Sequence, residues 1–402
     1  MLLAYCTNVH AGSDLATTQA EWANHAVAVR RRFCPDKPLG LGAWFSARTA
    51  AELCGDRGRL EEFAGWARSQ QLVPVTFNGF PYGDFHQEVV KHGVYEPPWW
   101  EEPRLEYTWH LVELIDVLFP DEMPATISTL PIGWPTDAQN REAALSGAAD
   151  RLVRLADRLA VREKESGRHI MVCLEPEPGC ILQRADDVVA FFEQHLLPAA
   201  RRCLPAARYE SVVRRHVGVC HDICHSAVMF EGQRDAIERY RAAGIAIGKV
   251  QISSAVRIPP PEASVSPKEQ SAAIDQLSRF AEDRYLHQTT WRSPDGDVRF
   301  FEDLPRALAM RDQGLDREWR THFHVPIYLA SCGSLGTTQD DIRTFFQVIE
   351  PGEVLQYEVE TYAWNVLPDE LQRDSLAEGI AEELEWGLGV GGWGLECVGV
   401  GG

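Results

Sequence analysis

The sequence predicts an α/β protein of the (β/α)8 TIM barrel class, with long loop insertions at the C-terminal face of the barrel. Short apolar runs alternate along the chain with longer helix-like segments, which is typical of right-handed βαβ units and a parallel sheet. Asp, Glu and His side chains also follow several of these runs directly, where a parallel barrel carries its functional groups. A length of 402 residues is compatible with one such domain.

The chain contains nine apolar runs of strand length: Leu2–Asn8, Leu39–Phe45, Leu72–Asn78, Ala125–Leu130, Ile170–Glu175, Val217–Asp222, Ile245–Ile252, His322–Leu329 and Leu355–Thr361. A closed eight-stranded barrel requires one fewer. Either one run is a short accessory strand, or the region between Ile252 and His322 is an excursion from the barrel. We favour the excursion, in which residues 287–291 are a candidate for a further strand.

Helical periodicity is clear in four of the intervening segments: Ala143–Glu165, Asp186–His195, Asp235–Ala243 and Thr338–Ile349. We therefore expect a single barrel domain over residues 1–385, with insertions at about 78–110 and 253–318. The first insertion is rich in glycine, proline and aromatic residues. It is either a satellite cluster packed under a long loop or a lid that shields a pocket from water. Residues 386–402 form a glycine-rich, low-complexity tail that is expected to contribute little to the fold.

Composition excludes several classes of function. A formal net charge of −20 disfavours nucleic acid as a partner, because gripping a polyanion requires a basic stripe. No apolar run is long enough to span a membrane, and the first residues lack the basic region of a signal peptide. The ten cysteines show no paired zinc-finger spacing, and several lie in apolar runs where a reduced thiol acts as a small hydrophobe. We expect a soluble, cytoplasmic protein without direct membrane insertion.

Potential metal ligands follow four of the runs in the second half of the chain. The motif Asp222-x-x-His225, at the end of a run that leads into a helix, is weak alone, since a polar pair at a helix start is common. It gains weight because similar residues lie at the ends of three other runs: Glu175 with Glu177, His322 with His324, and Glu358 with Glu360. Several carboxylates in one buried mouth repel one another without a cation, so the cluster favours a metal more than any member does.

The expected ligands are Glu175, Asp222, His225, His322, His324 and Glu360. Five of them, without His322, could fill one octahedral site, and adding Glu177 and His322 would permit two metals. Glu177 could alternatively be a general base, and His221 faces away from Asp222 and is expected to be structural. Oxygen and nitrogen donors without a cysteine suit Mn²⁺, Fe²⁺, Co²⁺ or Zn²⁺, one or two per chain, and suit Mg²⁺ less.

Other polar residues near strand ends are candidates for substrate binding. Lys249 and Gln251 face the same side of one strand, where a lysine could bind a substrate oxyanion or neutralise the carboxylates. The remaining candidates, each of which could equally be a hydrogen-bonded rim residue, are Asn8, His10, Trp44, Asn78 and His86.

With these residues assembled, the chain resembles the xylose-isomerase-like TIM-barrel superfamily, in which ligands come from late strands as Glu, Asp-x-x-His, His and Glu. Within it, residues up to about Pro368 are similar to the EboE family of bacterial ebo metabolite-traffic operons. The segments that carry this resemblance are residues 5–10, 78–83, 128–134, 173–179, 221–228, 322–326 and 360–368. The resemblance implies a role in processing or exporting a secondary metabolite beside other ebo-operon proteins, and it implies no particular reaction.

Three functions remain open at this point. The first is a metal-dependent isomerase or epimerase for a small polyhydroxylated or sugar-like molecule, in which Glu175, Glu177 or Glu360 moves a proton between carbons. The second is a metal-dependent phosphoester hydrolase like the endonuclease-IV branch of the superfamily, acting on a small substrate. The third is a non-catalytic protein that holds a metabolite for transfer.

Overall fold

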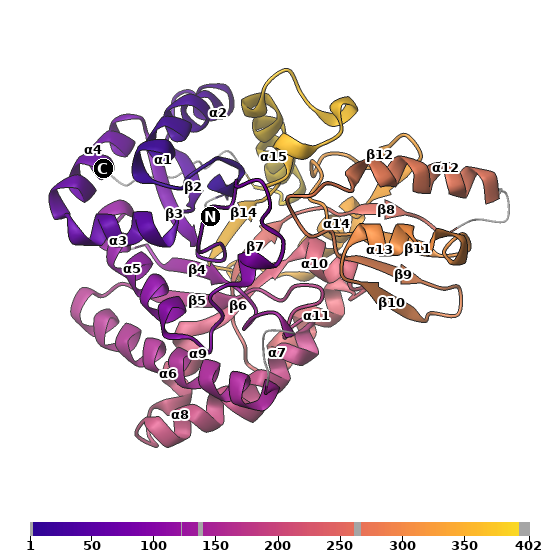
Figure 1. The fold of residues 1–402 in the computed structure, drawn as a ribbon. Coiled ribbons are helices and arrows are strands. Elements are labelled where there is room, and N and C mark those ends of the chain that lie inside the picture. The colour runs from indigo at the N-terminus through magenta and orange to yellow at the C-terminus, as the bar shows by residue number, and fades with distance from the viewer. Residues whose placement is uncertain (1–2, 122, 136–139, 261–266, 394–402) are drawn as a thin grey trace.

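Eight parallel strands close into a barrel, which confirms the predicted fold class (Figure 1). The structure is a computed structural model and describes residues 3–121, 123–135, 140–260 and 267–393. Around the barrel the strands run in the order β1-β14-β7-β6-β5-β4-β3-β2, and each neighbouring pair is parallel. Their bounds are β1 Leu3–Cys6, β2 Leu39–Ala43, β3 Leu72–Asn78, β4 Ala125–Thr129, β5 Ile170–Leu174, β6 Val217–Asp222, β7 Ile247–Ile252 and β14 Gln356–Val359.

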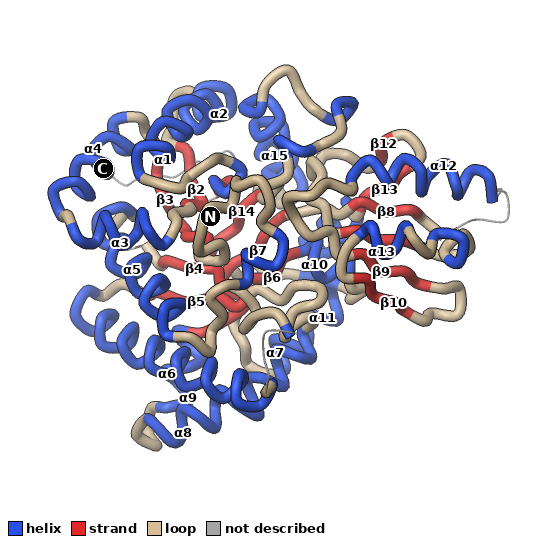
Figure 2. The backbone as a smooth tube through the Cα atoms, in the orientation of Figure 1, coloured by secondary structure: helices blue, strands red, loops and turns tan. Residues whose placement is uncertain are grey.

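Helices surround the barrel, as Figure 2 shows in blue around the red strands. In chain order they are α1 Leu15–Glu21, α2 Val27–Phe33, α3 Ala47–Gly55, α4 Arg57–Ser69, α5 Glu102–Leu118, α6 Arg141–Ser166, α7 Ala185–Phe191, α8 Leu197–Cys203, α9 Tyr209–His216, α10 Ile223–Val228, α11 Gln233–Ala242, α14 Gln339–Val348 and α15 Leu376–Val390. The four helices predicted from periodicity correspond to α6, α7 with the π-helical turn Phe192–Leu196, α11 and α14. No helix among the described residues is long and apolar enough to cross a membrane.

Helix α6 illustrates how local sequence sets these elements. The side chain of Asn140 accepts a hydrogen bond from the amide of Ala143 and caps the first turn. Alanine and leucine then recur at helical spacing and are buried against the barrel, as at Ala148 and Leu152. The helix ends at Gly167, whose φ of 76° places it in the left-handed region that glycine adopts without strain.

Charged and small residues fill the inside of the barrel beneath the C-terminal ends of the strands. The ammonium group of Lys249 lies 2.6 Å from a carboxylate oxygen of Glu358, and both side chains are fully buried. Gly42 makes room for this pair, because a Cβ there would lie 2.2 Å from the Glu358 carboxyl carbon. The layer is therefore an occupied ionic core that closes the cavity from below.

Between β7 and α14 the chain leaves the barrel and forms a second, antiparallel sheet. Its strands run in the order β10-β9-β11-β8-β13-β12 and lie to one side of the barrel in Figure 1. They span Val256–Ile258 (β8), Thr289–Arg292 (β9), Val298–Phe301 (β10), Glu318–Thr321 (β11), Ser331–Cys332 (β12) and Leu335–Thr337 (β13), with the helices Pro267–Leu277 (α12) and Leu304–Leu308 (α13). The expected excursion and its further strand at 287–291 are present, but the excursion continues to residue 337 instead of ending at 318.

The prediction of a barrel strand at His322–Leu329 is wrong. These residues carry no strand ladder, and they connect β11 to β12 within the second sheet. Their backbone makes single bonds to other loops, such as Val325 N to Ser254 O at 3.0 Å, and Pro326 has no amide to donate. The eighth barrel strand is therefore β14.

Two predicted boundaries also differ. Helix α5 begins at Glu102, so the irregular segment after β3 ends at residue 101, short of the predicted 110. Helix α15 continues to Val390, beyond the predicted domain end at 385, because Leu384 and Gly387 still face the core. The later part of the predicted tail, residues 394–402, lies outside the described residues.

Candidate metal centre

Three carboxylates meet at the C-terminal mouth of the barrel. Glu175 follows β5, Asp222 ends β6 and Glu360 follows β14, and one oxygen from each lies within 4.8 Å of the other two. All three side chains are buried, with 2–4 % of their surface exposed. Their strands lead them there because the C-terminal ends of parallel strands share one end of the barrel. We call this group the carboxylate position.

Asp222 has two separable functions in this arrangement. Its Oδ1 caps helix α10 by accepting from the amide of His225 at 2.9 Å, and it also accepts from Ser253 Oγ at 2.7 Å. Its Oδ2 is buried and has no hydrogen-bond partner among the described residues. A buried carboxylate oxygen left without a partner is costly unless a cation satisfies it.

Three histidines of the mouth have their Nδ1 atoms engaged by acceptors. His225 Nδ1 donates to the carbonyl of Pro176 at 3.0 Å, and His324 Nδ1 to the carbonyl of Glu360 at 2.9 Å. His322 Nδ1 donates to the side-chain oxygen of Gln288 at 2.6 Å. Since an acceptor fixes the proton on Nδ1, each ring keeps a bare Nε2, as metal-binding histidines do.

The bare nitrogens face groups that are also electron-rich. The Nε2 atoms of His225 and His322 lie 3.2 Å apart, so two lone pairs oppose each other. Within the part of the chain that the structure describes, His324 Nε2 has no hydrogen-bond partner, and it lies 3.8 Å from the unpartnered Oδ2 of Asp222. Divalent cations remove both conflicts, and the donor set of imidazole and carboxylate suits them. The residues present therefore fit a metal centre.

Burial raises the pKa values of carboxyl groups in this centre and lowers those of its histidines. It raises the pKa of Glu360 to about 8, with Asp222 and Glu358 adding repulsion, and it raises the pKa of Glu175 with help from Glu360 and Asp222. It lowers the pKa of His225 to about 3 and that of His324 to about 4. The imidazoles are therefore neutral and ready to coordinate, while the carboxylates cannot all ionise without a positive charge nearby.

Glu177 lies beside this group in a separate hydrogen-bond network. Its Oε1 accepts from Tyr95 Oη at 2.8 Å and from Gln288 Nε2 at 2.9 Å. Gln288 thus connects Glu177 to His322, and it holds both in fixed orientations. Burial raises the pKa of Glu177 to about 7, and the hydrogen bonds from Tyr95, Gln288 and Cys180 limit the rise. A carboxyl group with a pKa near neutrality can both accept and donate a proton.

These side chains line a cavity whose free volume is about 540 Å³ with its open mouth included. The segment after β3, which contains the 3₁₀ turn Lys91–Tyr95 (η3), forms one wall through Phe80, Phe85, Val90, Val94 and Tyr95. Tyr285 and Leu286 of the excursion and Tyr362 after β14 contribute further apolar surface. The segment after β3 therefore lines the cavity with aromatic and aliphatic groups, and its role as a lid remains a prediction.

The predicted substrate residues are divided between the cavity wall and the layer around it. Asn8 and Asn78 line the cavity, and both donate to Glu360 Oε1, at 2.6 and 3.1 Å. Gln251 lies behind Glu175, 3.4 Å from both of its carboxylate oxygens, and Lys249 is paired with Glu358. The contacts of Lys249 match the neutralising role, one of the two roles predicted for it.

The other predicted contacts lie outside the cavity wall. His86 Nε2 bonds to the backbone carbonyl of Asn8 at 2.7 Å, and Trp44 Nε1 donates to the carbonyl of Pro81 at 3.0 Å. His10 bonds to Tyr5 Oη at 3.1 Å and stacks on His25. His221, expected to be structural, bonds to Gln233 Oε1 at 2.7 Å. These residues therefore make hydrogen bonds and ring contacts around the cavity, and none of them lines it.

Several residues of the centre were missed by sequence reasoning. Tyr95 and Tyr362 come from segments without a strand or long-helix period, and Gln288 lies in the predicted strand 287–291, where no role was assigned to it. Cys224 was assigned to no ligand set, although it stands between Asp222 and His225 and its sulfur lies within 4.8 Å of His322 and His324 nitrogens. The Asp222-x-x-His225 motif was a signal that could have drawn attention to it.

Glu383 of α15 ties together the two loops that carry His324 and Glu360. Its carboxylate accepts from Ile327 N at 3.1 Å, Thr361 Oγ1 at 2.6 Å and Trp364 Nε1 at 2.9 Å. The side chain is buried, so removing the acceptor leaves three donors unpaired.

We expect Glu383→Leu to lower the free energy of unfolding by about 2 kcal/mol. It should also weaken metal binding about 10-fold, since it loosens the support of two ligands. Urea denaturation and metal titration measure the two effects. The control is Glu382→Leu, whose exposed pair with Arg373 should matter by less than about 0.5 kcal/mol. Equal effects of the two variants would contradict the positioning role.

Comparison with known proteins gives remote structural matches. No family model and no curated protein matches the sequence. A zinc-bound structure of IOLI protein is 12% identical and covers 97% of this chain and 98% of its own, with a TM-score of 0.47. A xylose isomerase-like TIM barrel protein from Mycobacterium smegmatis in complex with magnesium is 14% identical, with coverages of 97% and 96% and a TM-score of 0.48. An AP endonuclease, family 2, from Brucella melitensis is 15% identical, with coverages of 71% and 91% and a TM-score of 0.38.

Proposed function

We propose that this protein is a metal-dependent isomerase or epimerase acting on a small polyhydroxylated or sugar-like molecule. The proposal is carried by one combination of features. Ligand atoms of Asp222 and His324 have no partner among the described residues, and burial raises the pKa of a separate carboxyl group, Glu177, to about 7. A cavity walled by aromatic side chains suits a small molecule better than a polymer. The ligands would come from Glu175, Asp222 and Glu360, with His225, His322, His324 and Glu177 available for a second ion.

In this proposal the protein's side chains move the proton, hold the base in place and exclude water. A bound divalent cation would supply charge stabilisation to adjacent carbonyl and hydroxyl oxygens of the substrate. The Glu177 carboxylate accepts the proton from the carbon next to the carbonyl and returns it to the carbonyl carbon. The hydroxyl proton moves to the former carbonyl oxygen, so that an aldose and a ketose interconvert. For epimerisation, a protonated Glu175 or Glu360 delivers its own proton to the same carbon from the opposite side, and Glu177 keeps the proton it removed. Tyr95 and Gln288 hold Glu177 in place, while Phe80 and Phe85 exclude water.

Glu177→Gln provides the test of this proposal. We expect the metal-loaded wild type to exchange a carbon-bound hydrogen of its substrate with D₂O, and the variant to do so at least about 10²-fold more slowly. NMR of a panel of aldoses, ketoses and sugar acids measures the exchange, and elemental analysis should find at least one metal ion per chain in both proteins.

The matched control is Glu231→Gln. Glu231 is a carboxyl group whose pKa burial also raises to about 7, but it accepts from the amide of Ala185 near the start of α7 and belongs to none of the candidate ligand groups. Exchange should be unaffected by this change. No exchange with any compound of the panel, or equal loss in both variants, would count against the proposal.

Hydrolysis of a small phosphoester is the second candidate function. It is favoured by the group Glu177, His225 and His322, which can hold an ion beside the carboxylate position, because paired cations stabilise the attacking and leaving oxygens. Release of inorganic phosphate from small phosphomonoesters by the metal-loaded protein would support it. Failure of both assays together with tight binding of a metabolite would favour the third function, non-catalytic metabolite transfer.

We further propose that the chain belongs to the xylose-isomerase-like superfamily and to its EboE family. The support is the order Glu175, Asp222 with His225, His322 or His324, and Glu360 along the chain, together with the similar segments of the sequence. A cytoplasmic protein that acts beside other ebo-operon products in secondary-metabolite traffic follows from this membership. Co-purification of those products with the tagged full chain tests it, and their absence at native expression levels would contradict it.

A further inference from the structure

We propose that Cys224 is a sulfur ligand to a second, softer cation position next to the carboxylate position. We call it the thiol position and define it by Cys224, His322 and His324, whose sulfur and one nitrogen each lie within 4.8 Å of one another. The proposal rests on the metal dependence inferred above, and it adds which metals the centre takes.

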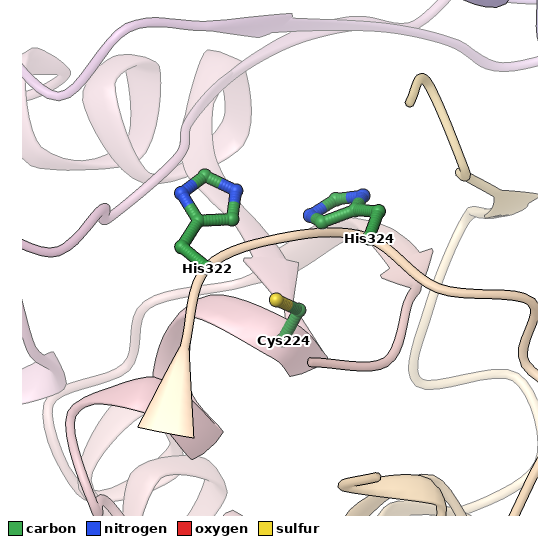
Figure 3. A group of neighbouring side chains, drawn as sticks. All are labelled: Cys224, His322 and His324. Carbon is green, nitrogen blue, oxygen red and sulfur yellow. The ribbon is translucent and has the colours of Figure 1, made fainter. Parts of the chain in front are cut away.

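Figure 3 shows how the three side chains are arranged. His322 and His324 come from the same extended segment, and Cys224 comes from the first turn of α10 on the side facing them. The thiol is fully buried, and the amide of Cys224 donates to Ser253 Oγ at 2.9 Å. Ser253 also donates to Asp222, so one hydroxyl fixes the backbone of Cys224 relative to a ligand of the carboxylate position.

In both histidines of the thiol position, a hydrogen bond at Nδ1 leaves Nε2 free to coordinate a metal. His322 and His324 each use Nδ1 as a donor, which leaves Nε2 as the free ligand atom of both. His324 Nε2 is buried and unpartnered, and His225 Nε2 lies 3.2 Å from His322 Nε2 as a further donor. Two imidazoles and one thiolate, with a fourth position left open, are donors that Zn²⁺ takes readily.

The two positions differ in chemical hardness. Carboxylates alone suit Mg²⁺ and Mn²⁺, whereas thiolate and imidazole select Zn²⁺, Co²⁺ and Fe²⁺. The simpler alternative is that Cys224 is a small hydrophobe, since it packs with Val228 and Ala255. That alternative does not explain why the sulfur is near two bare nitrogens, and it predicts no metal–sulfur bond.

The first experiment is zinc X-ray absorption spectroscopy on the full-length wild type loaded with Zn²⁺. We expect one sulfur neighbour at about 2.3 Å beside nitrogen and oxygen neighbours at about 2.0–2.2 Å. This measurement needs no variant. Zinc bound by nitrogen and oxygen alone would overturn the role of Cys224 and leave the metal dependence intact, whereas a protein that binds no metal would overturn both.

Cobalt titration of variants gives an independent readout. Wild type should develop a thiolate-to-cobalt charge-transfer band in the near ultraviolet, and Cys224→Ser should lose the band and bind Co²⁺ about 10²-fold more weakly. Mn²⁺ affinity at the carboxylate position should stay the same in both. Cys34→Ser, which changes a buried cysteine at the end of α2, is the control and should keep the band. A band that persists in folded Cys224→Ser would contradict the assignment, and circular dichroism verifies the fold.

Discussion

Replacing Asp222 with asparagine is expected to remove stoichiometric metal while leaving the protein folded. Asparagine keeps an oxygen that can cap α10 and accept from Ser253, but it removes the anionic oxygen that lacks a partner. Four-ligand zinc sites bind with about 10–16 kcal/mol, so one ligand contributes roughly 3 kcal/mol. The affinity should therefore fall by about 10²-fold or more.

Elemental analysis of protein purified without chelator or nickel resin measures this effect, followed by titration with Mn²⁺, Zn²⁺ and Co²⁺. Asp222→Ala should lose the metal and, in addition, about 1 kcal/mol of stability, because the cap is lost as well. Asp187→Asn is the matched control, since Asp187 accepts from backbone amides of Gln183 and Arg184 at the start of α7. Full metal content in Asp222→Asn would contradict the metal centre, as would a metal-free wild type after reconstitution.

The barrel could be predicted from the sequence because its signal is local. Each strand buried on both sides is a short apolar run, and the run from Val217 to Asp222 ends at a polar residue that also starts a helix. Because Glu175, Asp222 and Glu360 are placed at strand ends, the sequence alone predicts that they lie close together. Their roles as ligands remain predictions.

The segment from His322 to Leu329 shows where local patterns mislead. Its alternation of histidine and apolar residues is that of a strand, and an extended loop presents side chains with the same period of two. His322 and His324 therefore lie on one side, as predicted, although the segment pairs with no barrel strand. Whether an extended segment joins a sheet depends on its neighbours, and those are set by the excursion.

Residues that act through distant partners left no signal in the sequence. Gln288, in the excursion between β7 and α14, makes hydrogen bonds to His322 and Glu177. Tyr95, in the segment after β3, makes another to Glu177. Glu383 follows an acidic neighbour, Glu382, that is exposed on the same helix, so composition alone cannot distinguish the two. Such contacts depend on how loops pack, which neither periodicity nor propensity encodes.

In metal-free protein, ionisation of Glu360 is expected to reduce stability as the pH rises from 5 to 8, and Glu360→Gln is expected to remove this loss relative to wild type. Burial and neighbouring carboxylates raise the pKa of Glu360 to about 8, whereas in the unfolded chain a glutamate titrates near its ordinary value of 4.5. Between these values the folded state holds a proton that the unfolded state has released, so unfolding becomes more favourable as pH increases. Glu175 and Glu177 shift in the same direction, and the combined effect is on the order of several kcal/mol.

Chemical denaturation in the presence of a chelator at pH 5, 6.5 and 8 measures this loss. Glu360→Gln should match wild type at pH 5 and exceed it at pH 8, because the amide has no proton to release. A saturating divalent cation should stabilise wild type at pH 8 and leave Glu360→Gln nearly unchanged, since the cation stabilises the ionised carboxylates.

Glu231→Gln separates the centre from buried carboxyl groups in general. Burial raises the pKa of Glu231 to about 7, so this variant should also gain stability at pH 8 without metal. Unlike Glu360→Gln, it should still respond fully to the cation, because Glu231 lies outside the group of Glu175, Asp222 and Glu360. If the stability difference between metal-free Glu360→Gln and wild type were the same at pH 5 and pH 8, the carboxylates would not be held in repulsion. The strongest electrostatic reason for a cation at this mouth would then be lost.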